Sequence, residues 1–366
     1  MRVLHCIGSL GGGGAERQLA YLTPVLVRRG VDVHIAYQRG GHNLDELRSS
    51  GATLHELIAS SNYDPVLLWR FVKLFHQIRP DLIQSWLTQM DVFAGLAAFL
   101  TRTPLVMTER SVEMAYEGSW KEYLRSWIGR RAALVVANSN RGRAYWVSRR
   151  RRLPVQVIRN GVPIDQIRRA EAVSQRESNI PDSAELLLFA GRYSPEKNLL
   201  NLLDAIVLVL ADRRNAVARL FGEGPLKEEL TAKVRREGVG DRVKVMGYTF
   251  QLWNWMKRAS LFVSVSVFEG NPNTVLEAAV QGCPLVVSDI PEHREVLGDD
   301  ASFVSASSPN DIARGVLDVL ENREAARVKA WAASQRATQM TVESMADQYL
   351  RGYSQILQCH SCFRQS

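Results

Sequence analysis

Two carboxylates, Glu269 and Glu277, stand eight residues apart in the stretch Ser266–Asp289. The apolar segment Leu261–Val265 precedes them, and a loop with a proline leads into a helical pattern that begins at Asn273. The first N–H groups of a helix, together with the positive end of its dipole, bind phosphate. Carboxylates beside such a helix start can accept hydrogen bonds from sugar hydroxyls. The spacing therefore predicts a binding site for a nucleotide sugar.

Two cations follow the apolar segment Leu186–Ala190, namely Arg192 and Lys197 in the loop Gly191–Asn198. A diphosphate leaving group needs about two negative charges neutralised as its bond to the sugar breaks. One solution is a divalent metal held by an Asp-x-Asp pair, and this chain contains no such pair. The other is a pair of fixed cations, because a guanidinium fork and an ammonium point charge together complement a diphosphate. We therefore expect no metal and assign the neutralising role to these two side chains.

A glycine-rich loop, Gly8–Gly14, follows the first apolar segment, Val3–Ile7. Such a loop lets backbone N–H groups approach a ligand without interference from side chains. A nicotinamide enzyme is the rival interpretation. If its pattern Gly-x-Gly-x-x-Gly begins at Gly11, however, Glu16 stands where the third glycine should be. The second predicted strand also ends in Tyr37-Gln38, with no acid to hold a ribose.

Short apolar segments alternate with helical patterns throughout the chain, which predicts an α/β fold with parallel sheets covered by helices on both faces. The predicted strands of the first half are Val3–Ile7, Val31–Tyr37, Thr53–Leu57, Leu82–Ser85, Leu105–Thr108, Leu134–Ala137 and Val155–Ile158. Those of the second half are Leu186–Ala190, Val217–Phe221, Val243–Val245, Leu261–Val265 and Leu285–Val287. Ligands of open parallel sheets bind outside the carboxyl ends of the strands, so two facing sheets would place their sites in the cleft between them.

Five sequence elements in order resemble the retaining glycosyltransferases of family four, the "group 1" enzymes with two facing Rossmann-like domains, called the GT-B fold. They are the glycine loop, Asn160-Gly161-Val162, Gly191-Arg192 with Pro195-Glu196-Lys197, Gly222-Glu223-Gly224-Pro225, and the pair Glu269 and Glu277. The resemblance covers essentially the whole chain. It implies a retaining, metal-independent enzyme that moves a sugar from a uridine diphosphate donor to a glycan or lipid-linked acceptor. Assembly of bacterial polysaccharide or lipopolysaccharide is the implied pathway.

The resemblance also implies roles for individual residues. Glu277 would accept hydrogen bonds from the ribose hydroxyls, and Glu269 would lie near the donor sugar. Family members retain configuration through front-face departure of the diphosphate, so no protein nucleophile is required and the catalytic role of Glu269 stays open. The positions implied to hold the donor are Gly12, Gly13, Arg192, Lys197, Gly222, Gly247, Gly270, Asn271, Asn273, Thr274, Val275 and Glu277.

Glu109, at the end of a predicted strand, occupies a position where many relatives carry a histidine close to the donor sugar. We predict that Glu109 contacts the acceptor or the sugar and add it to the catalytic candidates. A structural ion pair with Arg110 is the alternative. The loop Arg159–Val162 matches the family's Asn-Gly-Val and is predicted to be structural.

The polar stretch Ile167–Ser183 reads as a linker and predicts a domain boundary near residue 175. Residues 1–175 would form the acceptor-binding domain and residues 176–345 the nucleotide-sugar-binding domain. The helical pattern Val342–Leu357 resembles the closing helix of the family, so residues 346–366 would return to the first domain.

Composition limits the class of protein. The 366 residues are 46% hydrophobic and 23% charged, as expected for a globular chain of two domains. The run Val92–Leu100 is far shorter than the roughly 20 apolar residues of a spanning helix, and Val3–Ile7 is too short for a signal-peptide core. The four cysteines are scattered, and Cys359 and Cys362 lack a second pair to complete a zinc site. We expect a cytoplasmic protein.

The basic charge belongs to the first half, where residues 1–180 contain 25 Lys and Arg against 15 Asp and Glu. Aromatic and aliphatic residues recur at helical spacing from Trp120 to Ile128, beside Lys121, Arg125, Arg130 and Arg131, and the run Arg149–Arg152 follows. This interleaving predicts peripheral contact with anionic lipid at the inner face of the cell membrane. A core helix with a solvated charged face is the alternative. Nucleic-acid binding is not expected, because no nucleic-acid-binding motif accompanies the charge.

Two further functions stay open. A nucleotide-sugar epimerase shares the fold but needs a differently placed set of acids and a histidine for proton abstraction. A catalytically silent scaffold would have no chemical reason to keep Arg192, Lys197, Glu269 and Glu277 together.

Overall fold

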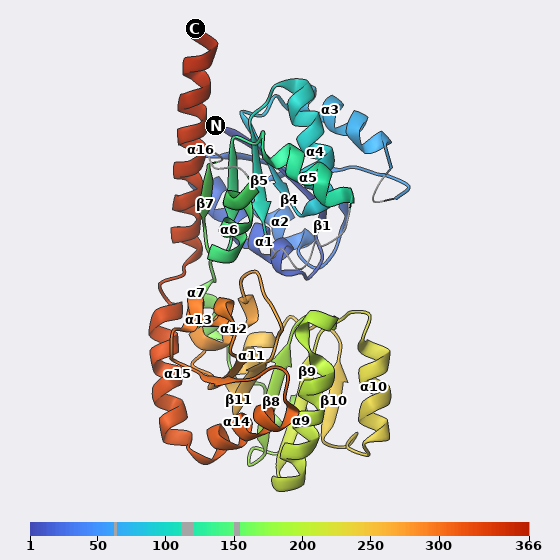
Figure 1. Ribbon diagram of the computed structural model, residues 1–366, viewed down its shortest axis with the longest axis vertical. Coiled ribbons are helices and arrows are strands. Elements are labelled where there is room, and N and C mark those ends of the chain that lie inside the picture. Colours follow the sequence, from blue (N-terminus) through green and yellow to red (C-terminus); the bar gives the residue numbers. More distant parts are fainter. Residues whose placement is uncertain (62–63, 111–119, 150–153, 366) are drawn as a thin grey trace. The chain divides into compact units, whose positions relative to one another are not determined.

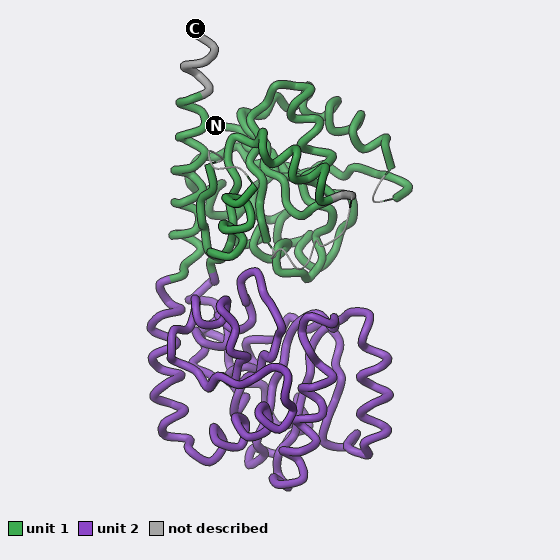
Figure 2. Tube along the Cα trace, in the orientation of Figure 1, with its two compact units in different colours: residues 1–161, 340–366 green, residues 162–339 purple. Residues whose placement is uncertain are grey.

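The computed structural model describes residues 1–61, 64–110, 120–149 and 154–365. The chain forms two compact units, Met1–Gly161 with Met340–Ser366, and Val162–Gln339 (Figure 2). Each unit is built on one parallel sheet covered by helices (Figure 1). The predicted fold class, α/β with two parallel sheets, is confirmed.

The sheet of the first unit has seven strands in the order β3-β2-β1-β4-β5-β6-β7. The strands are β1 (Arg2–Ser9), β2 (Asp32–Arg39), β3 (Thr53–Glu56), β4 (Leu82–Trp86), β5 (Leu105–Glu109), β6 (Leu134–Ala137) and β7 (Val155–Val157). The helices are α1 (Gly14–Arg28), α2 (Leu44–Ser49), α3 (Val66–Ile78), α4 (Thr88–Thr101), α5 (Trp120–Gly129), α6 (Asn140–Arg149) and α16 (Val342–Gln365). All seven strands lie where the apolar segments predicted them.

Side chains of β1 alternate between two cores, because successive residues of a strand point to opposite faces. Val3 and Ile7 pack with residues of α1 and α16, whereas Leu4 and Cys6 pack with residues of α3 and α4. The central strand is therefore buried on both faces, as parallel sheets require.

The sheet of the second unit has six strands in the order β10-β9-β8-β11-β12-β13. The strands are β8 (Glu185–Ala190), β9 (Ala216–Phe221), β10 (Val243–Met246), β11 (Leu261–Ser264), β12 (Leu285–Ser288) and β13 (Ser302–Val304). The helices are α7 (Ile164–Arg169), α8 (Gln175–Ser178), α9 (Leu199–Asp212), α10 (Lys227–Arg236), α11 (Leu252–Arg258), α12 (Asn273–Val280), α13 (Pro291–Leu297), α14 (Pro309–Glu321) and α15 (Arg323–Ala337), with one 3₁₀ turn, η2 (Pro195–Lys197). The sequence did not predict β13, which has three residues and pairs only with β12 at the sheet edge.

The stretch predicted to be a linker contains α7 and α8 and is tied to the second unit by hydrogen bonds. The side-chain amide of Gln281 donates to the carbonyl oxygen of Ile167 at 2.9 Å, and the Val173 N–H donates to that of Asn254 at 3.2 Å. In the structure the chain passes from one unit to the other between Gly161 and Val162, earlier than residue 175.

The long helix α16 belongs to the first unit (Figure 2). Its buried residues Val342, Met345, Tyr349 and Tyr353 join the core that also contains residues of α1. The Tyr353 hydroxyl bonds to the side-chain oxygen of the β4 residue Gln84. Within the described ranges, no helix is both long and apolar enough to cross a membrane.

Candidate active site

The loops that follow β8, β9 and β10 are joined through Tyr193, a residue that the sequence did not single out. Its backbone N–H donates to the carbonyl oxygen of Glu223 at 2.8 Å, and its carbonyl oxygen accepts from the Leu226 N–H at 3.1 Å. Its buried hydroxyl donates to the carbonyl oxygen of Leu220 and lies 2.8 Å from that of Met246. Three loops at the carboxyl edge of the sheet are therefore fixed to one another.

Gly222 and Gly224 allow this close approach of backbones. Their φ angles are +155° and +152°. A Cβ at Gly222 would lie 1.9 Å from the carbonyl oxygen of Gly191, and one at Gly224 would lie 2.4 Å from that of Tyr193. Only glycine fits at either position. The Gly-x-Gly-Pro element thus has a structural role, and contact between Gly222 and the nucleotide stays a prediction.

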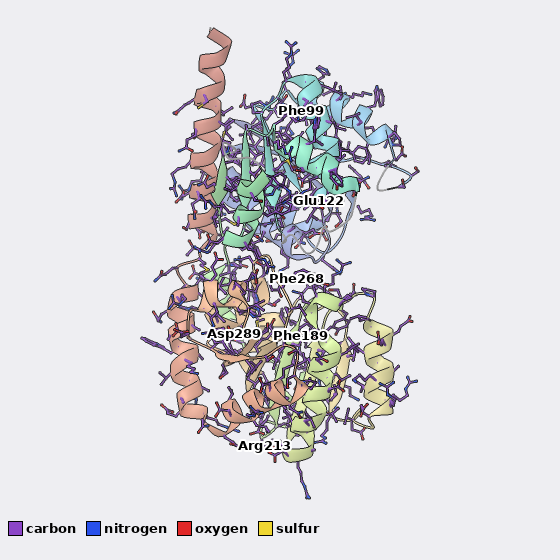
Figure 3. The ribbon with its side chains drawn as sticks, viewed as in Figure 1. Phe99, Glu122, Phe189, Arg213, Phe268 and Asp289 are labelled. Atoms are coloured by element: carbon purple, nitrogen blue, oxygen red, sulfur yellow. The ribbon has the colours of Figure 1, made fainter. Side chains whose placement is uncertain are left out.

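Lys197 and Glu269, singled out from separate motifs, meet in the second unit. The Lys197 Nζ lies 2.5 Å from the Glu269 Oε1, and the two side chains are 19% and 11% exposed. The Ser266 hydroxyl donates to the same carboxylate oxygen at 2.7 Å. In Figure 3 the label on Phe268 marks the loop between β11 and α12 that carries this carboxylate.

The environment keeps the Glu269 carboxylate ionised. Burial alone raises the pKa of this carboxyl, but the positive charge of Lys197, the neighbouring His293 and the hydrogen bonds from Lys197 and Ser266 act in the opposite direction. The result is a pKa below the ordinary value of a glutamate. The site therefore holds a fixed negative charge paired with a fixed positive one.

Arg192 behaves differently from Lys197. Its side chain is exposed, and among the described residues its guanidinium forms no hydrogen bond or ion pair. Lys197 thus contacts Glu269, whereas the N–H groups of the Arg192 guanidinium have no partner within the described ranges.

Glu277 lies on α12 and is fully buried. The indole N–H of Trp253, on α11, donates to its Oε2 at 3.1 Å. No signal in the sequence pointed to this partner. The first turn of α12 contains no acidic residue and no side-chain cap, so its N–H groups are not satisfied by a carboxylate of its own. Of the other predicted donor-binding residues on this helix, Asn273 and Val275 are buried.

The glycine loop of the first unit is held from two sides. The Ser9 hydroxyl donates to the Glu16 Oε1 at 2.9 Å, and a Cβ at Gly13 would lie 2.4 Å from the Glu16 Oε2. The Asn43 side-chain amide donates to the carbonyl oxygen of Gly11. Glu16 therefore occupies the space that a side chain at Gly13 would need.

Glu109 lies at the end of β5 in a fully buried network. Its Oε2 accepts from the Arg125 guanidinium at 2.8 Å and from the Trp146 indole N–H at 2.9 Å. Arg125 also bonds to Asp91 at 2.6 Å. Burial raises the pKa of the Asp91 carboxyl, although Arg125 and Ser85 act against the rise. Contact of Glu109 with an acceptor stays a prediction.

The partners of two arginines differ from those expected. Glu109 does not pair with Arg110, the suggested partner, but with Arg125. Arg110 donates to the Asn160 Oδ1 at 2.9 Å, in the Asn-Gly-Val loop, and stacks over the Trp86 ring. Arg125 was counted with the basic surface residues, but it is fully buried. Its charge is balanced there by the carboxylates of Asp91 and Glu109.

The other side of α5 is aromatic and exposed. Tyr123 is 80% and Trp127 44% exposed, whereas Ile128 is buried. The Arg131 guanidinium lies 4.0 Å from the centre of the Trp127 ring. Arg149 pairs with Glu122 at 2.6 Å. The rest of the predicted arginine run, like the side chains of residues 120–121 and 360–366, lies outside the described residues.

Comparisons with known proteins agree with this architecture. The family model described as Glycosyltransferase Family 4 matches residues 12–166, and that described as Glycosyl transferases group 1 matches residues 171–336. Anabaena HepE, solved in complex with UDP-glucose, superposes with a TM-score of 0.87 at 20% identity over 97% of this chain and 100% of its own.

Two bacterial relatives match over nearly their whole length. The N-acetylgalactosamine-N,N'-diacetylbacillosaminyl-diphospho-undecaprenol 4-alpha-N-acetylgalactosaminyltransferase of Campylobacter jejuni is 25% identical over 94% of this chain and 98% of its own. The lipopolysaccharide core biosynthesis glycosyltransferase LpsD of Rhizobium meliloti is 23% identical over 96% and 97%. The chain is an enzyme of the group 1 glycosyltransferases, the retaining family four with the GT-B fold.

Proposed function

We propose that this glycosyltransferase moves a sugar from a uridine diphosphate donor to a glycan or lipid-linked acceptor, without a metal, in bacterial polysaccharide or lipopolysaccharide synthesis. The relatives support the pathway, because one is named for a diphospho-undecaprenol acceptor and another for lipopolysaccharide core synthesis. UDP-glucose in the HepE complex supports the donor class. We assign donor binding to the second unit, Val162–Gln339, and acceptor binding to the first unit, Met1–Gly161 with Met340–Ser366.

The observation that carries the proposal is the contact of Lys197 with Glu269. The ammonium group has three donors, and Glu269 takes one of them at 2.5 Å. The ammonium group, with the guanidinium of Arg192, which has no ion pair within the described part of the chain, can neutralise a diphosphate as the glycosidic bond breaks. In this proposal Glu269 faces the donor sugar, so that its negative charge stabilises the positive charge that develops there.

The other residues orient the donor. The buried Glu277 carboxylate would accept hydrogen bonds from the ribose hydroxyls, and the Trp253 indole fixes its position. N–H groups at the start of α12, from Gly270 to Val275, would hold the sugar and phosphate. The acceptor hydroxyl would attack from the face that the diphosphate leaves, which retains the anomeric configuration.

Incubation with a panel of UDP-sugars, with nucleotide release and sugar identity both measured, tests the proposal. Slow release of UDP without acceptor, from one donor in preference to the rest, is expected of the transferase. An interconverted sugar in place of release would indicate an epimerase. Binding of a UDP-sugar with no turnover would indicate a silent scaffold.

The lipid-linked acceptor would explain the exposed aromatic face of α5. Tyr123 and Trp127 present ring surface to solvent beside Arg131, the residue types that interfacial helices present to anionic lipid. Each basic residue near such a surface contributes about 1 kcal/mol of attraction. We propose that this helix makes peripheral contact with the inner face of the cell membrane.

Sedimentation with anionic vesicles at low and high salt tests this contact. Tyr123→Ser with Trp127→Ser should weaken vesicle binding several-fold and leave donor hydrolysis intact. Trp331→Ser is the matched control, because this tryptophan is also exposed but lies on α15 of the second unit. Equal binding by the wild type and the double variant would refute the proposed surface.

A further inference from the structure

His293 on α13 is a titratable side chain that the proposed mechanism does not use. Its ring is fully buried, and its Nδ1 lies 2.9 Å from the carbonyl oxygen of Ser288 and 3.2 Å from the hydroxyl of the same residue. A carbonyl oxygen can only accept, so the Nδ1 carries the hydrogen and donates it. The Nε2 of the neutral ring then carries a lone pair and can accept a hydrogen bond. In the described part of the chain this atom has no hydrogen-bond partner.

A series of hydrogen bonds connects His293 to the predicted catalytic carboxylate, Glu269. The Ser288 hydroxyl donates to the carbonyl oxygen of Ser266 at 2.6 Å. The Ser266 hydroxyl donates to the Glu269 Oε1 at 2.7 Å, the oxygen that also accepts from Lys197. Both serines are buried. In Figure 3 the label on Phe268 marks the loop after β11, which contains Ser266, and the label on Asp289 marks the residue that follows Ser288 at the end of β12.

Two charged side chains of the site, Glu269 and Lys197, act on the imidazole. Burial lowers the pKa of His293, the Glu269 carboxylate raises it, and Lys197 lowers it, with a net shift below the ordinary value. The next residue of the helix, Arg294, is partly exposed and pairs with Asp289 at 2.8 Å and Asp299 at 2.5 Å. At neutral pH the network therefore contains one ammonium, one carboxylate and one neutral ring.

A donor changes this balance. The diphosphate of a nucleotide sugar brings two negative charges to Lys197, which is the main counter-charge of Glu269 in the free protein. Glu269 is then a buried anion, and its cation, Lys197, also interacts with the more highly charged diphosphate. His293 can supply the missing positive charge, because its buried Nε2 has no hydrogen-bond partner among the described residues and its ring is joined to Glu269 through Ser288 and Ser266.

We propose that His293 takes up one proton from solvent when a donor diphosphate engages Lys197, and thereby becomes the second counter-charge of Glu269. The inference rests on the proposed function. The proton is bound at the Nε2 as the donor binds and returns to solvent when the nucleotide leaves, and no bond of the donor is made or broken in this step. His293 is a positioning residue that acts through Glu269.

Calorimetric titration with UDP, in buffers of different ionisation enthalpy, measures the number of protons bound per UDP. The phosphate of UDP titrates near neutral pH itself, so the wild type is compared with variants rather than with zero. His293→Asn retains an N–H group that can donate to Ser288 and removes the titrating ring. Glu269→Gln keeps the shape of the side chain and removes the charge that demands a counter-charge.

Between about pH 6 and 8, the wild type should take up more protons than either variant, by up to one per site. Equal proton numbers in all three proteins would overturn the inference while leaving UDP binding intact. Failure of UDP to bind to any of them would contradict the proposed function itself. Thermal unfolding of each variant shows whether it is folded.

Nitrogen-15 NMR of the His293 ring gives a second, direct measurement. The free wild type should show the neutral ring with hydrogen on Nδ1, and saturation with UDP should convert it to the charged ring. His293→Asn identifies the resonance by its loss. A ring that stays neutral with UDP bound would refute the proposal, even if activity falls in the variants.

Discussion

Replacement of Lys197 by alanine should destabilise the second unit as well as slow the reaction. The Lys197 and Glu269 side chains are only 19% and 11% exposed, and the 2.5 Å contact leaves little room for water between them. Removal of one partner of such a pair leaves an uncompensated buried charge, at a cost of about 3 kcal/mol. For a unit of this size, this loss corresponds to a fall in Tm of about 6–12 °C.

The double variant Lys197→Ala with Glu269→Gln separates the two effects. It carries no unpaired carboxylate, so it should regain most of the lost Tm while its turnover stays about 10²–10³ below wild type. Differential scanning calorimetry and UDP-release rates under saturating donor measure the two quantities. A Lys197→Ala protein that unfolds at the wild-type temperature would refute the assigned burial, and one with more than about half of wild-type turnover would refute the diphosphate role.

Three other changes test the remaining assignments. Arg192→Ala should cut turnover by about 10²–10³ but leave the Tm unchanged, because the side chain is exposed and unpaired within the described ranges; a stability loss equal to that of Lys197→Ala would contradict this. Glu277→Ala should weaken binding of free UDP by about 1.5–3 kcal/mol in calorimetry, and Glu269→Ala should leave it nearly unchanged, so equal losses would contradict the division of roles. Arg125→Met should lower the unfolding free energy by about 3–5 kcal/mol in urea denaturation, because Glu109 and Asp91 lose their shared buried cation; a loss below about 1 kcal/mol would show that the network is dispensable.

The sequence predicted elements well wherever a strand is a run of apolar residues between turns. The edge strand β13 was missed because it is three residues long and buries only Val304. The stretch Ile167–Ser183 was interpreted as a linker from its polar composition, but the buried side chains of Ile167, Val173 and Ile180 and hydrogen bonds to Gln281 and Asn254 tie it to the second unit.

In the candidate active site, the motifs predicted which residues belong to the site but not which side chains contact one another. Lys197 and Glu269 are 72 residues apart, and only the arrangement of strands brings them into contact. Trp253 and His293 belong to no motif. The hydrogen bond of Trp253 to Glu277 and the link from His293 through Ser288 and Ser266 to Glu269 therefore depend on the tertiary structure. The interpretation of Arg125 as a surface residue failed for a related reason, since helical spacing does not reveal that two carboxylates lie under one face of α5.

The most direct test of the central claim is the rate of UDP release in the presence of excess chelator. If Arg192 and Lys197 neutralise the departing diphosphate, the chelated enzyme should turn over its preferred UDP-sugar at the rate of the untreated enzyme. Added magnesium or manganese should not raise that rate. Loss of turnover in chelator, with recovery on addition of either metal, would contradict the account.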